Sequence, residues 1–218
     1  MGNIKHVGIP PVSPLERRVV LHREALDLLD EDYPEESAAK IKLGILVPHY
    51  GSIDSHIVSV MTHSLVAFTE SRLYRSISDG AGLAYSVSGE HDGKYRQGVL
   101  EIRIPVNVNH VRKSVDSIFA EFRRLQETYL SAEELSDIQS NIIGQLAAKL
   151  DTSQHGVNAV TRHFDYGSTP EAFARKVASV SPADIVDAAR KFLPKSFEDG
   201  RYVLLIRDPF YSRNQHIV

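Results

Sequence analysis

The chain contains no cysteine, so neither a disulfide framework nor thiolate chemistry is available to it. No apolar run reaches the roughly 18 residues that indicate a membrane span. The formal net charge of −3 gives no reason to expect nucleic acid or an anionic membrane as a partner. Phosphate-binding loops, dinucleotide fingerprints and Gly-x-Ser-x-Gly nucleophile turns do not occur either, which disfavours small-molecule enzymes of those classes.

What is present is ordinary for a globular protein, with 42% hydrophobic and 24% charged residues among 218. A chain of this length can bury a substantial core. No internal repeat or low-complexity linker interrupts it, and we therefore expect residues 1–218 to form a single domain. The start, from Met1 to His6, lacks the apolar core of a signal peptide, so we expect a soluble, cytoplasmic protein.

The hydrophobic periodicity alternates between strand-like and helical, which predicts an α+β fold. Strands are predicted at residues 17–25, 41–47, 83–90, 95–106 and 202–206, and His91-Asp92-Gly93 is the predicted hairpin turn. Helices are predicted at residues 55–68, 72–78, 111–129 and 132–150, and from 170 and 182 onward. We expect a mixed, largely antiparallel sheet with helices mainly on one face, and both long apolar stripes (111–129 and 135–150) packed against that sheet.

The most informative stretch is residues 71–87, which read Ser-Arg-Leu-Tyr-Arg-Ser-Ile-Ser-Asp-Gly-Ala-Gly-Leu-Ala-Tyr-Ser-Val. A Ser-Arg-Leu-aromatic helix followed by Gly-Leu-Ala-Tyr-Ser-Val resembles the zinc metallopeptidases of the pitrilysin/insulinase type, which include mitochondrial processing peptidase. The helix openers at residues 130–135 and 166–185 extend this resemblance over nearly the whole chain. The resemblance implies one half of a clamshell-shaped peptidase.

In the family that the chain resembles, zinc is held by His-x-x-Glu-His on a helix and by a further Glu downstream. Two histidines at that spacing share one helical face, as metal chelation requires. The ten histidines here include no such motif, and His56 and His63 are separated by about 10 Å of helical rise. His155 and His163 are also too far apart. We therefore expect no metal site and no catalytic residue in the isolated chain, and zinc only in a partner half.

The resemblance also suggests which residues contact substrate, because the half without zinc donates an Arg and a Tyr to the facing site. Tyr85 matches that Tyr, but the Arg position, seven residues earlier, is Ser78. Tyr85 would then donate its hydroxyl to the substrate carbonyl or the developing oxyanion. The alternative is that Tyr85 is simply a strand aromatic beside the core. A Ser cannot supply the missing charge, so Arg75, three residues earlier on a helix, is the candidate substitute.

Two functions follow from this resemblance. The chain is either the non-zinc half or subunit of a zinc metalloendopeptidase, completing the site of a zinc-bearing homologous half, or an inactive homologue that serves as a peptide-binding or structural assembly subunit. In both, extended peptide would add as a strand to the sheet edge. A homo-oligomer is a further partner arrangement to consider. A third alternative, an unrelated α+β scaffold for interactions, is distinguished from these by its fold.

Overall fold

The computed structural model describes residues 38–67, 71–79, 81–93, 97–150, 157, 169–199 and 201–207. The strand predicted at residues 17–25 and the histidines at 155 and 163 lie outside this range. Four strands form one sheet in the order β2-β3-β1-β4. They are β1 (Ala38–Val47), β2 (Ser88–Asp92), β3 (Gly98–Asn107) and β4 (Tyr202–Arg207), and every pairing among them is antiparallel.

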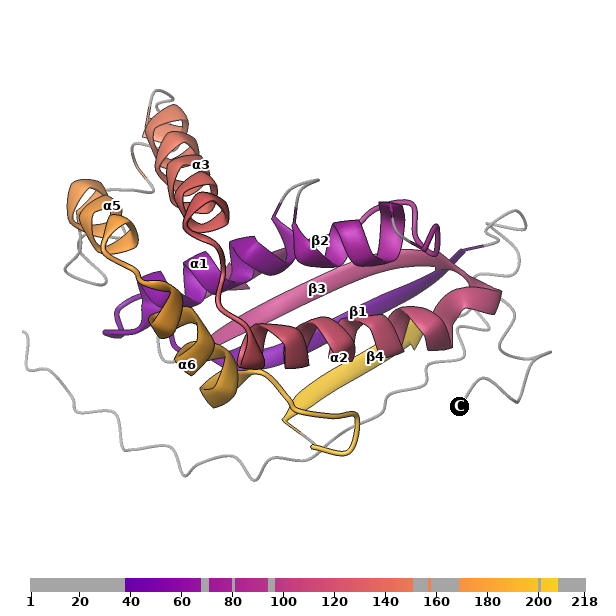
Figure 1. The fold of residues 1–218 in the computed structure, drawn as a ribbon. Helices are drawn as coiled ribbons and strands as arrows, with labels where there is room; N and C mark the ends of the chain where they lie inside the picture. Colours follow the sequence, from indigo (N-terminus) through magenta and orange to yellow (C-terminus); the bar gives the residue numbers. More distant parts are fainter. Residues whose placement is uncertain are drawn as a thin grey trace, which may run out of the picture.

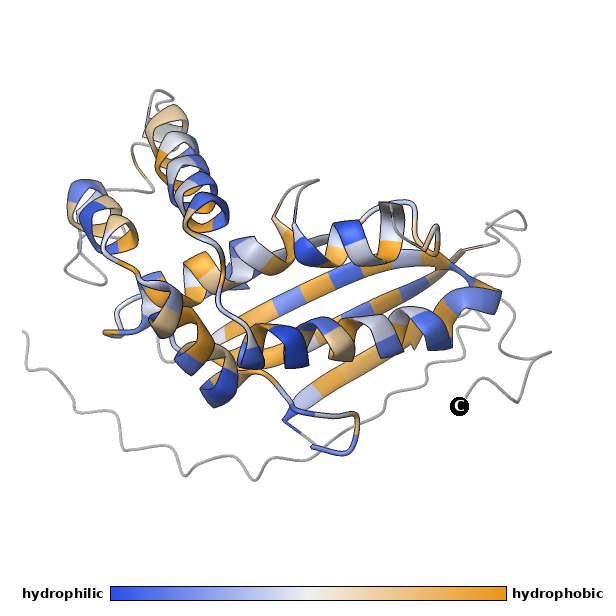
Figure 2. Ribbon diagram, viewed as in Figure 1, coloured by the Kyte–Doolittle hydropathy of each residue, from blue (hydrophilic) through white to orange (hydrophobic). Residues whose placement is uncertain are grey.

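The central pair of strands, β1 and β3, forms the apolar floor of the core. Alternate residues of each strand face the helices, and the cross-strand pairs on that face are Ile41 with Ile104, Leu43 with Ile102, and Ile45 with Leu100. All six side chains are buried. The alternation is visible along the strands in Figure 2. One face of β3 is therefore buried, and the residues between are partly or fully exposed.

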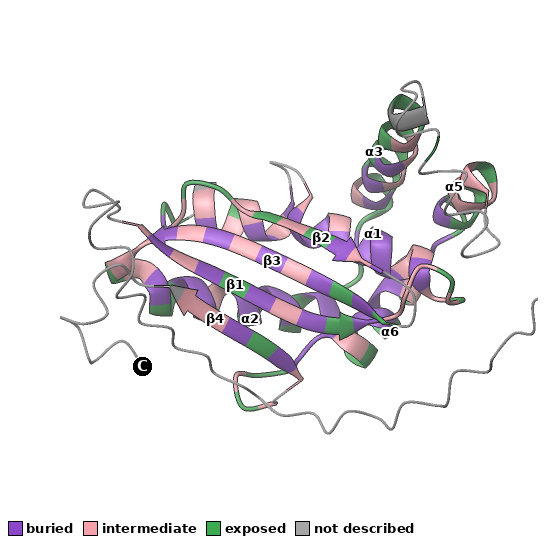
Figure 3. Ribbon diagram, turned by 180° about the vertical axis from the view of Figure 1, so that it is seen from behind, coloured by how far each residue is buried: buried purple, intermediate pink, exposed green. Residues whose placement is uncertain are grey.

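The described helices cover one face of the sheet, as predicted (Figure 1), and none of them lies on the opposite face (Figure 3). The covering helices are α1 (Ser55–Val66), α2 (Val111–Glu127) and α6 (Pro182–Phe192). A short π-helix, η1 (Tyr74–Asp79), packs beside α2, and a 3₁₀ turn, η2 (Val108–His110), leads from β3 into α2. The architecture is therefore an α+β sandwich of one sheet and one helical layer.

The prediction for the two long helices is correct for one of them. The apolar stripe of α2 is buried and contacts β3, although Tyr129 lies beyond the helix end and is exposed. Helix α3 (Ala132–Leu150) instead packs mainly against α1 and α5 (Pro170–Ala178), and with α5 it projects beyond the sheet in Figure 1. Its stripe is narrow, with Leu135, Ile138 and Ile142 buried, and two neighbouring helices suffice to cover it.

Side-chain caps fix the starts of α3, α5 and α6. Ser131 Oγ accepts the backbone N–H of Glu134 at 3.1 Å, Thr169 caps α5, and Ser181 forms a complete capping box on α6. Asp54 occupies the N-cap of α1 but makes no cap bond. Its carboxylate accepts a hydrogen bond from Lys191 Nζ at 2.7 Å, so an ion pair to α6 replaces the cap.

The predicted hairpin exists, but its turn lies later than expected. His91 and Asp92 belong to β2 and pair with Leu100 and Val99, so they are not turn residues. The buried ring of His91 explains the difference, because its Nε2 lies 2.8 Å from the Pro48 carbonyl oxygen and anchors the strand end. The first strand of the hairpin also begins later than predicted, at Ser88.

None of the described helices combines the length and apolar character needed to cross a membrane.

Candidate functional site

The motif residues begin on a short helix that is anchored by its apolar side chains. Leu73 and Ile77 are completely buried, and Ser71 is buried at its start. From Tyr74 to Asp79 the backbone winds as a π-helix, which is rare and often found at functional sites. A π-helix has a wider turn than an α-helix. Two residues three positions apart, which would share one face of an α-helix, therefore do not share a face here.

Gly82 turns the chain from this helix to the sheet. Its φ of +59° is in the left-handed region, which favours glycine. Its N–H donates to the Ser78 carbonyl at 3.0 Å, and the N–H of Leu83 donates to the Ile77 carbonyl at 2.8 Å. Both hydrogen bonds satisfy carbonyls at the helix end, and they direct the following residues onto β3.

Ser78 and Tyr85 are brought together by this turn. The Ser78 hydroxyl is half-buried and donates to the Ala84 carbonyl at 3.1 Å, directly before Tyr85. Ala84 forms an isolated bridge with Val106, and the Tyr85 N–H donates to the Pro105 carbonyl at 3.4 Å. Ser78 therefore joins the helix end to Ala84, the bridge residue directly before Tyr85. Tyr85 itself lies in a bend ahead of β2, so the expectation that it lies on a strand is not met. It supplies a neutral hydroxyl where an Arg would supply a charge.

The Tyr85 side chain extends into solvent from this rigid base. It is 73% exposed, and no hydrogen bond to its hydroxyl occurs among the described residues. A strand aromatic that belonged to the core would be covered, so the interpretation of Tyr85 as a packing residue is not favoured. Its hydroxyl is free to donate to a group outside the chain.

Arg75 is directed elsewhere. Its Nη2 lies 3.7 Å from Glu134 Oε1, at the start of α3, and half of its side chain is exposed. Arg72 binds the same carboxylate in a bidentate manner, with Nε and Nη2 at 2.9 and 3.1 Å from its two oxygens. Burial alone would raise the pKa of Glu134, but the hydrogen bonds and charge of Arg72, with that of Arg75, lower it. The structure therefore places Arg75 with Arg72 and Glu134, and among the described residues no hydrogen bond joins the Arg75 side chain to Ser78.

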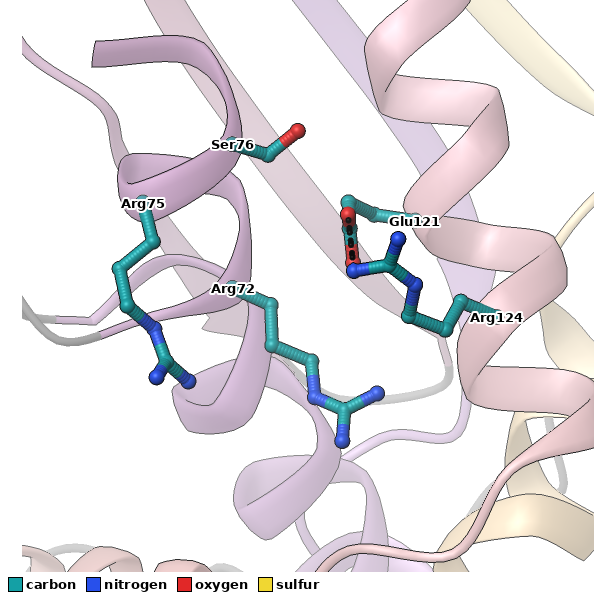
Figure 4. Close-up of a pocket in the computed structure, with 5 residues that line it drawn as sticks. All are labelled: Arg72, Arg75, Ser76, Glu121 and Arg124. Atoms are coloured by element: carbon teal, nitrogen blue, oxygen red, sulfur yellow. Dashed lines mark ion pairs between the residues drawn. The ribbon is translucent and has the colours of Figure 1, made fainter. Parts of the chain in front are cut away.

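A pocket that no sequence pattern indicated lies between this helical segment and α2. Its lining residues are Arg72, Arg75, Ser76, Glu121 and Arg124 (Figure 4). Arg124 Nη1 lies 3.1 Å from Glu121 Oε1, and Glu121 is buried. One signal was available in the sequence, because Glu121 is a charged residue directly beside the apolar position Phe122 of the α2 stripe. No local sequence pattern indicates that residues 72–76 lie beside residues 121–124 in the fold.

The described histidines do not form a metal centre. His63 Nδ1 lies 2.9 Å from the Ser59 carbonyl oxygen on its own helix. Burial and the nearby charge of Lys176 lower the pKa of His56. Within the described residues, no group of three or more His, Asp or Glu side chains could hold a metal ion. This donor set does not fit the zinc site of the peptidases that the sequence resembles.

Comparisons with solved structures find the same fold. A peptidase M16 inactive domain from Pseudomonas fluorescens superposes with a TM-score of 0.68 at 17% identity, over 78% of this chain and 40% of that chain. A protease from Helicobacter pylori gives 0.67 at 16% identity, over 78% and 41%. The inactive peptidase domain of a Bordetella parapertussis protein assigned as a zinc protease gives 0.64 at 17% identity, over 77% and 90%. The chain thus spans about two fifths of the length of the first two proteins.

Comparison with curated proteins finds no match for this sequence. A family model described as the peptidase M16 inactive domain matches residues 2–142, which is more than half of the chain. The matched range includes the Ser71–Val87 motif, β1 to β3, and the start of α3. The chain therefore belongs to the peptidase M16 inactive-domain family, and its resemblance to the pitrilysin/insulinase-type metallopeptidases is confirmed.

Proposed function

We propose that this chain is the non-zinc half or subunit of a zinc metalloendopeptidase and that it completes the peptide site of a zinc-bearing homologous half. We also propose that residues 1–218 act together as this single half. The observation that carries the proposal is the exposed Tyr85 hydroxyl on a backbone fixed by Ser78, Gly82 and Pro105. Membership in an inactive-domain family favours a role in which the chain assists a catalytic partner and does not catalyse the reaction alone.

Tyr85 would act on the reaction by donating its hydroxyl hydrogen to the substrate carbonyl oxygen. The bond strengthens as that oxygen becomes an oxyanion, so it stabilises the transition state more than the ground state. Zinc in the partner half would supply Lewis acidity and an activated water. The contribution of this chain is a fixed donor, because backbone bonds hold Tyr85 at the strand and only its side chain is mobile.

Peptide would bind as an added strand at an edge of the sheet. β2 and β4 are the edge strands of the described sheet, and β2 follows directly after the Tyr85 segment. An extended peptide pairs with such an edge through backbone hydrogen bonds and therefore tolerates varied sequences. This geometry would place a peptide at β2 close to Tyr85.

The test is reconstitution with a zinc-bearing homologous half, followed by chelator-sensitive cleavage of a fluorogenic peptide. We expect Tyr85→Phe to lower turnover by about 10²-fold, as removal of an oxyanion donor does, and to leave complex formation and stability unchanged. Ser78→Arg should raise turnover if the missing charge limits the reaction. A stable complex whose cleavage rate is unchanged by both substitutions would contradict the proposal.

A second candidate function is an inactive homologue that serves as a peptide-binding or structural assembly subunit. It is favoured by Ser78, which lacks the charge of an Arg and uses its hydroxyl within the chain. It is also favoured by Arg75, which pairs with Glu134 and not with the Ser78 region. In this case the complex should form and bind peptide without changing the partner's cleavage rate.

A further inference from the structure

His56 lies where α1 meets two helices that belong to different parts of the molecule. It is in the first turn of α1, and both α5 and α6 pack against that helix. Helix α6 covers the sheet, whereas α5 projects beyond it together with α3 (Figure 1). A charge gained or lost at His56 therefore acts on the sheet-based core and on the projecting helices at the same time.

The surroundings of the His56 ring disfavour its protonated form. The residue is half-buried, and its Nδ1 is buried without a hydrogen-bond partner among the described residues. Protonation places a hydrogen on both ring nitrogens, so Nδ1 would become a buried donor that no acceptor satisfies. The ring also lies at the positive end of the α1 dipole, where a cation is unfavourable.

The charged groups around the ring act in opposite directions on its two sides. Lys176, on α5, repels a protonated ring. Asp184, on α6, and Asp54, directly before α1, attract it. Both carboxylates already have partners, because Asp54 accepts a hydrogen bond from Lys191 Nζ at 2.7 Å and Asp184 completes the capping box of α6. A proton on the ring is thus opposed from the projecting helices and favoured from the core.

We propose that protonation of His56 weakens the docking of the projecting helices α3 and α5 on α1 and leaves the core folded. The added charge repels the cation on α5, so the contact between α1 and α5 is the one that loses free energy. The contact between α1 and α6 gains an attraction from the same proton, because the charge that α6 presents to the ring is a carboxylate. The junction is a pH-sensitive contact, and it uses no residue of the motif at 71–87.

The direction of the pH response follows from the two states of the ring. Burial and then Lys176 lower the pKa of His56 below its ordinary value of 6.5 in the closed form. These effects outweigh Asp54, Asp184 and the backbone of Ile53, which favour the charged ring. Opening returns the ring to water, so the open form binds a proton more readily than the closed form does. Opening therefore becomes more favourable as the pH falls from 6.5 through the lowered pKa, and it is insensitive to pH well above 6.5.

The test is native-state hydrogen exchange of the full chain at about pH 7.5 and about pH 5.5, corrected for the intrinsic exchange rates. The amides of α5 report on the projecting helices, and those of β1 report on the core. We expect the opening equilibrium constant of α5 to rise about threefold or more at the lower pH, and that of β1 to stay unchanged. No rise in α5, or an equal rise in β1, would overturn the proposal.

The variants assign the response to one ring. His56→Gln is uncharged at both pH values and should abolish the acid response of α5, whereas His63→Gln, a half-buried position on the same helix, should retain it. Lys176→Gln should reduce the response because it removes the repelling cation, and Arg175→Gln, its exposed neighbour, should leave it unchanged. Lys176 is exposed, so its replacement keeps the chain folded and tests the proposal independently of any packing change at His56. An acid response that persists in full in both His56→Gln and Lys176→Gln would overturn the proposal.

Discussion

Glu134 is the residue on which the motif helix and α3 converge. Its carboxylate receives three guanidinium contacts, two from Arg72 and one from Arg75. The Arg72 side chain is 11% exposed and that of Glu134 is 23% exposed, so the pair lies between a surface ion pair and a core one. The bidentate geometry makes it stronger than a typical surface pair. It joins two segments that are about 60 residues apart in the sequence.

We expect Glu134→Gln to lower the free energy of unfolding by about 1–3 kcal/mol, because it leaves Arg72 charged and mostly buried without a counter-charge. The measurement is urea denaturation at neutral pH. Glu133→Gln is the matched control, since it removes the same charge from the same helical turn at an exposed position. We expect its effect to stay within about 0.5 kcal/mol. Equal effects of the two changes would show that the Arg72 pair does not stabilise the fold.

The same carboxylate predicts a pH dependence. The pKa of Glu134 in the folded chain lies below its ordinary value of 4.5, because the arginines outweigh burial. A lowered folded-state pKa gives stability that is fully present above 4.5 and is lost as the pH falls through the folded-state value. The stability difference between wild type and Glu134→Gln should therefore be constant near neutral pH and shrink below about pH 4.5. A difference that grew on acidification would contradict this sign.

At the scale of elements, local patterns predicted most of the fold. Period-two alternation predicted β1 and β3, and helical spacing predicted α2, because each element buries one face against the same core. The docking of α3 was not predictable in the same way. Its stripe fits either a sheet or a pair of helices, and the choice depends on where α5 lies. The π-helical winding of Tyr74–Asp79 also has no periodic signature in six residues.

Two glycines provide an element-scale test in which one substitution has opposite effects. Gly82→Ala should destabilise the chain by about 1 kcal/mol, because alanine is strained at a φ of +59° even though no atom blocks its Cβ. Gly144→Ala, on the exposed side of α3, should stabilise it by about 0.5–1 kcal/mol, because glycine is a poor helix former. Thermal denaturation measures both. Stabilisation by Gly82→Ala would show that the turn does not need its left-handed residue.

At the scale of the whole molecule, the candidate site was only partly predictable. The motif placed Ser78 and Tyr85 near one turn, and the structure brings them together through the Ala84 carbonyl. The pocket could not be predicted, because Arg72 and Glu121 meet only when the motif helix packs on α2 across the folded core. Sequence spacing describes neighbours within one element, whereas this meeting depends on how two elements pack.

The molecule also divides into a sheet-based core and a projecting pair of helices. Helices α3 and α5 contact each other and α1, and they lie beyond the sheet in Figure 1. Gln139 joins the pair, because its Nε2 donates to the Val177 and Val180 carbonyls at 3.0 Å each. A lobe with few contacts to the central strands should open separately from the core.

Native-state hydrogen exchange tests this division. We expect amides of α3 to exchange through an opening with a lower free energy than that of the central β1 residues. Gln139→Ala should lower the α3 opening free energy by about 1 kcal/mol and leave β1 unchanged, because it removes the bonds to α5 and its following loop. Gln145→Ala is the control, since that side chain bonds only Asn141 on its own helix. A change of equal size in α3 and β1 would mean that the chain unfolds as one cooperative unit.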